Sequence, residues 1–118
     1  MSEIKNKTKK RILSKKIKLL TTHAQHAQGL MFTREKKDFG LVFVMHSPQK
    51  IPIHMMFVFY QIDVLWLDEN KKVIDLREEC PPFHPYIIHK SSAQYLVELP
   101  KGTIKKTKTK IGDEISWS

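Results

Sequence analysis

Residues 53 to 67 read Ile53-His54-Met55-Met56-Phe57-Val58-Phe59-Tyr60-Gln61-Ile62-Asp63-Val64-Leu65-Trp66-Leu67. β-Branched and aromatic side chains, which favour strands, make up most of this stretch, and it is too apolar for a surface loop. No turn residue separates its two halves, so it predicts one bent strand or two consecutive strands. We expect no membrane span, because the apolar run from 51 to 67 is marginal in length and contains Pro52, His54 and Asp63.

Shorter stretches on both sides of this run also favour strands. The predicted strands cover residues 11–20, 41–45, 72–76, 93–99 and 114–117. Turns are predicted at residues 47–50, 68–71 and 112–113, an irregular proline-rich connection at 78–92, and short helices at 23–28 and 103–109. This pattern predicts a mostly β fold, a compact antiparallel β-sandwich or barrel with one or two short helices.

The length and the charge distribution predict how the chain is divided. A chain of 118 residues is typical of a single domain, which we place at residues 11–118. Residues 1–20 hold eight Lys or Arg residues against Glu3, so residues 1–10 are predicted to be a basic, flexible tail. No secretory signal is visible, which favours a cytoplasmic location. The single cysteine, Cys80, excludes an internal disulfide and a cysteine-based metal site.

Asp63 is the strongest candidate for a functional residue, because it is a carboxylate inside an apolar run. A buried carboxylate must be paired, hydrogen-bonded or part of a site. Asp63 could bind a cationic ligand or act as a base, or it could be a structural carboxylate that accepts backbone N–H bonds. The methionines, including Met31 and Met55, could suit a soft metal but are far more often core residues, so no metal site is predicted.

The net charge of +9 raises the alternative of nucleic-acid binding. Lys outnumbers Arg eighteen to three, so forked contacts to bases are scarce and any binding is predicted to be weak and non-specific. The candidate contacts are Lys9, Lys10, Arg11, Lys15, Lys16, Lys105, Lys106 and Lys108. The competing interpretation is that these lysines serve solubility.

Several short motifs, in this order and spacing, are shared with a known family. They are Gly29-Leu30-Met31-Phe32 with Arg34, Gly40-Leu41-Val42-Phe43-Val44, Met55, Ile62-Asp63-Val64 with Leu67-Asp68, Ala93 to Pro100 with Gly102, and Ile111-Gly112-Asp113. On these residues the chain resembles the domain-of-unknown-function 192 family, also called uncharacterised protein family 0127. It looks like the short archaeal form, without a leader peptide. The resemblance implies a compact β-rich, jelly-roll-like fold and no particular reaction.

One segment departs from the family pattern. Where the family has Trp-Met-Lys-Asn-Thr, this chain has His54-Met55-Met56-Phe57-Val58, so a polar pocket there would be altered. Asp63, His54, Met55 and Met31 are therefore the candidate ligand-binding residues. We predict a non-enzymatic ligand-binding or protein-interaction module, with no catalytic residues and no cofactor. The alternatives are a nucleic-acid-associated protein, which uses the lysines, and an enzyme, which uses Asp63.

Overall fold

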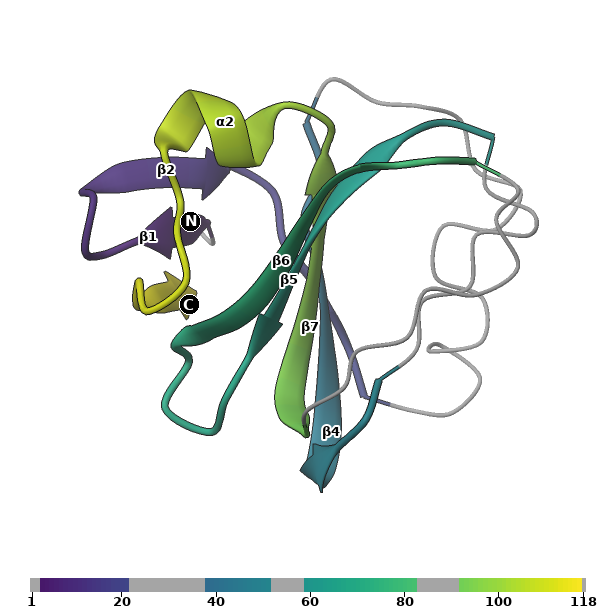
Figure 1. Ribbon diagram of the computed structural model, residues 1–118, viewed down its shortest axis with the longest axis vertical. Helices are drawn as coiled ribbons and strands as arrows, with labels where there is room; N and C mark the ends of the chain where they lie inside the picture. Colours follow the sequence, from purple (N-terminus) through teal and green to yellow (C-terminus); the bar gives the residue numbers. More distant parts are fainter. Residues whose placement is uncertain (1–2, 22–37, 52–58, 83–91, 118) are drawn as a thin grey trace.

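The computed structural model describes residues 3–21, 38–51, 59–82 and 92–117. Strands dominate these ranges and form two sheets, with one short helix beside the smaller sheet (Figure 1). The elements are β1 (Ile4–Asn6), β2 (Arg11–Ser14), β3 (Lys18–Leu20), β4 (Leu41–Gln49), β5 (Ile62–Leu67), β6 (Val73–Cys80), β7 (Ala93–Pro100), α2 (Thr103–Thr107) and β8 (Ile115–Trp117).

The larger sheet has the strand order β3-β4-β7-β5-β6. Its neighbours run antiparallel, except that β3 and β4 are parallel. Strand β5 lies between β6 and β7, and all six of its residues are buried. A strand that is covered on both faces needs apolar side chains on both, which explains why β5 is apolar at every position except Asp63 and does not alternate between apolar and polar residues.

The smaller sheet has the order β2-β1-β8 and is antiparallel. Its central strand, β1, lies in the segment that we predicted to be a flexible tail. That prediction is wrong for residues 3–10, because Ile4 is 0% exposed and pairs with Ser14 on one side and Trp117 on the other. Burying Ile4 and Asn6 between two neighbouring strands outweighs the polar character of the flanking lysines.

Two apolar clusters cover the two faces of the larger sheet. One contains Trp66, Phe43 and Tyr60. The other joins Leu65 and Leu99 of the larger sheet to side chains of the smaller sheet and to Ile104 of α2. The smaller sheet and α2 therefore pack against one face of the larger sheet, as in a β-sandwich, and the described strands do not close into a barrel. The predicted fold class is confirmed in this form.

Most element boundaries agree with the sequence-based prediction, with three differences. The turn predicted at 47–50 is wrong, because β4 continues through Gln49. Strand β6 continues to Cys80, into the predicted irregular connection, and the predicted strand at 11–20 is divided into β2 and β3. The predicted helix at 23–28 and the first half of the apolar run, up to Val58, lie outside the described residues. Within the described ranges, no helix has the length and apolar character that crossing a bilayer requires.

Candidate anion-binding site

Asp63 is fully buried on β5, on the face that α2 covers. Its two carboxylate oxygens accept backbone hydrogen bonds from different elements: Oδ1 from the Glu79 N–H at 2.9 Å, and Oδ2 from the Ile104 N–H at 2.8 Å. The pairing of β5 with β6 is irregular here, and Glu79 has a left-handed φ of 51°. Asp63 thus ties this β-bulge to the start of α2, which supports the structural interpretation of this carboxylate.

The bond from Ile104 also fixes the turn that leads into α2. Gly102 adopts a left-handed φ of 86°, which glycine tolerates without a Cβ clash. The Thr103 hydroxyl donates to the Pro100 carbonyl at 2.7 Å, and the Thr107 hydroxyl donates to the Thr103 carbonyl at 2.7 Å. The turn from residue 100 to residue 103 is therefore held at both ends, and it forms one wall of a cleft.

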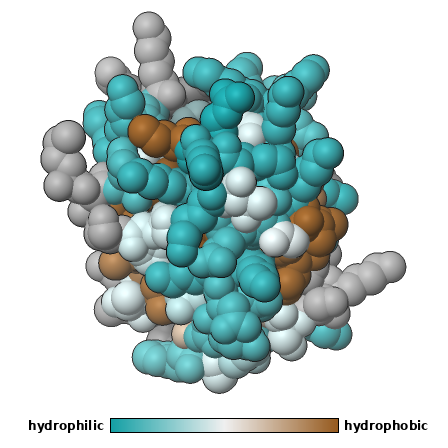
Figure 2. Space-filling view, turned by 90° about the vertical axis from the view of Figure 1, so that its left-hand side faces the viewer, coloured by the Kyte–Doolittle hydropathy of each residue, from teal (hydrophilic) through white to brown (hydrophobic). Residues whose placement is uncertain are grey.

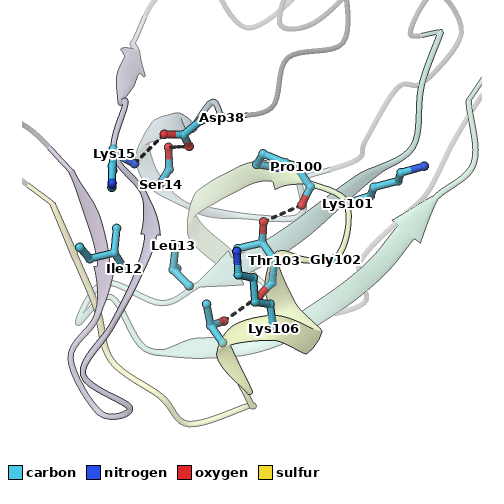
Figure 3. Close-up of a pocket in the computed structure, with 11 residues that line it drawn as sticks. Ile12, Leu13, Ser14, Lys15, Asp38, Pro100, Lys101, Gly102, Thr103 and Lys106 are labelled. Atoms are coloured by element: carbon cyan, nitrogen blue, oxygen red, sulfur yellow. Dashed lines mark hydrogen bonds between the residues drawn. The ribbon is translucent and has the colours of Figure 1, made fainter.

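This cleft lies between β2 and α2 and has a volume of about 560 Å³ (Figure 3). Residues 12–15 line one wall, and residues 100–103 with Lys106 and Thr107 line the opposite wall. Asp38 lies at one end. Leu13 extends from β2 into the space between the walls, so the lining is apolar at its centre and polar around it.

The charge of the lining is mainly positive, from Lys15, Lys101 and Lys106. All three side chains are exposed, and none forms an ion pair with an acidic residue in the described part of the chain. Lys106 extends beside Thr103, whereas Lys101 points outward from the turn (Figure 3). The Asp38 carboxylate is the negative group of the lining, and it accepts hydrogen bonds from Ser14 Oγ at 2.8 Å and from the Lys15 N–H at 3.1 Å.

A second cavity, of about 380 Å³, adjoins the cleft at Ile12. Its lining is also basic and comprises Lys5, Asn6, Lys7, Lys10, Arg11 and Ile12. Glu3 and Glu114 form ion pairs with Lys5 and Lys7, each at 3.0 Å. Hydrophilic side chains dominate this side of the molecule (Figure 2), which carries the β1–β2 hairpin and α2. The two cavities share the exposed side chain of Ile12, and together they form one basic surface.

The basic residues that we predicted as nucleic-acid contacts lie at several different places on the surface. Lys10, Arg11, Lys15 and Lys106 line the two basic cavities. Lys16 lines a smaller cavity near Gly40, and Lys105 and Lys108 are exposed without lining any of these three cavities.

Lys9, another of the predicted contacts, forms an ion pair in which its ammonium group contacts both oxygens of Asp113, at 3.0 and 2.9 Å. Asn6 Nδ2 donates to Asp113 at 2.9 Å and to Thr109 Oγ1 at 3.0 Å. Burial raises the pKa of Asp113, but the hydrogen bonds from Asn6 and Lys9 outweigh it and hold that pKa below its usual value. Lys9 and Asp113 thus join the β1–β2 hairpin to the turn before β8.

Three of the candidate ligand-binding residues, Met31, His54 and Met55, lie outside the described residues. The candidate residues did not include Ser14, Asp38 or Thr103, whereas Lys101 begins the lysine-rich segment 101–110 on which the nucleic-acid alternative rests. The signal that was available is the Pro-Lys-Gly-Thr sequence at 100–103, a turn that carries a lysine and a hydroxyl beside a lysine-rich helix.

Two further buried groups have strongly shifted pKa values but lie outside the cleft. Burial raises the pKa of Glu98 to about 8, and this side chain is only 6% exposed. Burial also raises the pKa of the Cys80 thiol to about 12, although Arg77 opposes this. A thiol with such a pKa is protonated at neutral pH and is a poor nucleophile.

The profile of the DUF192 family, described as Uncharacterized ACR, COG1430, matches residues 4–117. A UPF0127 protein of Thermococcus sibiricus is 35% identical over 114 residues, which cover 95% of this chain and 72% of that protein. At this identity and coverage, the two chains are homologous throughout their matched length.

Two solved bacterial structures share the fold. A protein of unknown function from Novosphingobium aromaticivorans superposes with a TM-score of 0.85 at 20% identity, covering 98% of this chain and 83% of that one. A protein from Sinorhizobium meliloti 1021, described as a candidate transcription regulator, gives 0.81 at 23% identity, covering 86% of this chain and 80% of that one. These identities support a shared fold alone. Because the family profile spans nearly the whole sequence, this chain belongs to the DUF192 family.

Proposed function

We propose that this protein is a non-enzymatic binding module, which holds an anionic group of its ligand in the cleft between β2 and α2. The observation that carries this proposal is the presence of lysines on both walls of the cleft that have no ion-pair partner among the described residues. Unpaired cations around a concave surface raise the local concentration of anions and strengthen their binding.

The wall groups support the same ligand chemistry. Hydroxyl and backbone N–H groups of the cleft already bind one carboxylate, that of Asp38, at ordinary hydrogen-bond distances. The described lining contains no cysteine, no histidine and no second carboxylate. Asp63 lies beneath the turn with both oxygens engaged by backbone N–H groups, so it supports the cleft rather than reacting with a ligand.

The test is a titration of inorganic pyrophosphate into the full chain, followed by ¹⁵N NMR at constant ionic strength. We expect the Gly102 and Thr103 amide signals to shift with a single saturation curve. Lys15→Gln combined with Lys106→Gln should weaken binding at least tenfold, because each lysine contributes about 1 kcal/mol at a few ångströms in a solvated site.

The matched control is the double variant Lys50→Gln with Lys72→Gln. It removes the same two charges from exposed residues that do not line the cleft. We expect it to change the affinity less than twofold. Equal losses in both double variants would mean that pyrophosphate responds only to net charge, and the proposed site would then be rejected.

A second candidate function, non-specific nucleic-acid binding, is favoured by the continuity of the two basic cavities at Ile12. Five cations line them without an ion pair to a described residue: Lys10, Arg11, Lys15, Lys101 and Lys106. Among the described residues, neither lining contains an aromatic side chain on which bases could stack. Any such binding would depend on phosphate neutralisation and would be lost at high salt.

A further inference from the structure

We infer that Ser14 and Lys15 form an oxyanion subsite inside the cleft, and that Asp38 is its displaceable internal occupant. This inference rests on the proposed anion-binding function and specifies where the ligand's carboxylate or phosphate oxygens bind. The subsite consists of the Ser14 hydroxyl and the Lys15 backbone N–H, which contact the two oxygens of the Asp38 carboxylate.

These contacts have the geometry with which proteins bind the carboxylate of a ligand. A hydroxyl and a backbone N–H converge on one carboxylate, at 2.8 and 3.1 Å, in a cleft whose other charged side chains are all lysines. Charge-assisted bonds of this kind are stronger than neutral ones and do not distinguish a side-chain carboxylate from that of a ligand. A ligand oxyanion that enters the cleft can therefore bind the same two donors, in competition with the Asp38 carboxylate.

When Asp38 is displaced, the Lys15 N–H lies at an exposed position open to water, and the Ser14 hydroxyl keeps other partners. The Ser14 hydroxyl also lies 2.7 Å from the Lys16 carbonyl, and it accepts from the Lys16 N–H at 3.1 Å. A hydroxyl carries a single proton, so it can donate to the carbonyl when the carboxylate leaves. Asp38 itself is only partly buried, so its carboxylate can move into water without becoming an unpaired buried charge.

Asp38 also lowers the affinity of the cleft through its charge. It occupies one subsite directly, and it repels an anion held by Lys15 and Lys106 in the same cleft. Removing this charge while keeping the shape should therefore tighten anion binding about fivefold to tenfold, as one unit charge does in a solvated cleft.

The experiment compares the full-length protein with Asp38→Asn and with Glu69→Gln, which removes a carboxylate from the exposed turn between β5 and β6. Inorganic phosphate and acetate are titrated separately at constant ionic strength, and ¹⁵N NMR follows the amides of Lys15 and Gly102. We expect Asp38→Asn to bind at least one of the two probes fivefold to tenfold more tightly, and Glu69→Gln to change the affinity less than twofold. The probe that shows the gain identifies the ligand group as a phosphate or a carboxylate.

Unchanged or weaker binding by a folded Asp38→Asn variant overturns the inference. If that variant does not fold, the wild-type titration decides, because the Lys15 amide must shift along the same curve as Gly102. A shift at Gly102 without one at Lys15 rejects the subsite and leaves the proposed anion-binding cleft intact. No shift at either amide, with either probe or with pyrophosphate, removes both proposals.

Discussion

The carboxyl group of Glu98 should make the stability of this protein depend steeply on pH. Glu98 lies on β7 directly between Val64 of β5 and Leu41 of β4, and both of these neighbours are buried. Burial raises the pKa of Glu98 from 4.5 to about 8, because the ionised carboxylate loses its hydration there. The change we consider is Glu98→Gln, which keeps the shape and cannot ionise.

The sign and size of the effect follow from proton linkage. The folded pKa lies above the unfolded one, so between pH 4.5 and pH 8 the folded state binds one proton more than the unfolded state. Stability is therefore fully present below pH 4.5 and is lost as the pH rises to about 8. Each pH unit in this interval lowers the free energy of unfolding by up to about 1.4 kcal/mol, so the loss between pH 5 and pH 8 approaches 4 kcal/mol.

Urea unfolding at pH 5, 6, 7 and 8 measures this difference for the wild type and for Glu98→Gln. We expect the wild-type free energy of unfolding to fall about 3–4 kcal/mol more than that of Glu98→Gln over this range. The two proteins share every other titratable group, so the comparison isolates the contribution of Glu98. Glu69→Gln, which changes an exposed carboxylate, should follow the wild-type curve. If the curves for the wild type and Glu98→Gln run parallel within about 1 kcal/mol, the reasoning from burial is refuted.

Three other predictions concern the core and the basic surface. Asp63→Ala should lower the free energy of unfolding by about 1–3 kcal/mol, because it leaves the Glu79 and Ile104 N–H groups unsatisfied. Asp63→Asn should lower it by less. An alanine variant as stable as the wild type would contradict this prediction. Ile4→Ala should cost about 2–5 kcal/mol in chemical denaturation, and a cost below about 0.5 kcal/mol would mean that β1 adds nothing to the core. Titration of duplex DNA at several salt concentrations should give a slope near −4 to −5 for the logarithm of the binding constant against the logarithm of the salt concentration. Replacing the three cleft lysines with Gln should flatten this slope by about 3. Strong sequence discrimination, or binding that survives high salt, would point to a different surface.

Elements with a strong local pattern could be predicted from the sequence. The strand Ile62–Leu67, the turn at 68–71 and the helix at Thr103–Thr107 each carry their own signal, in strand formers, turn residues or flanking glycine. The burial of Asp63 could also be predicted, because its neighbours Ile62 and Val64 and the rest of the strand are apolar, as expected of a strand that is buried on both faces.

Elements that depend on distant partners could not be predicted. Strand β1 is three residues long and lies among lysines, and only its pairing with β2 and β8 makes it a strand. Pro48 suggested a turn, but it lies where the pairing of β4 with β7 is irregular, and a strand accommodates a missing N–H at such a position. The cleft combines residues near positions 14, 38 and 103, so a local pattern such as the turn at 100–103 describes only one of its walls.

The pairing of β1 with β8 has a consequence for the order in which this chain can fold during synthesis. Asn6 and Asp113, which hydrogen-bond to one another, are 107 positions apart, so the ribosome makes the central strand of the smaller sheet long before its second neighbour exists. Until β8 emerges, Ile4 and Leu13 lack a large part of their apolar cover, and loop closure over such a distance is slow. The nascent chain should therefore stay open to proteases and holding chaperones until β8 has left the ribosome, and resistance to both should arise abruptly at that point.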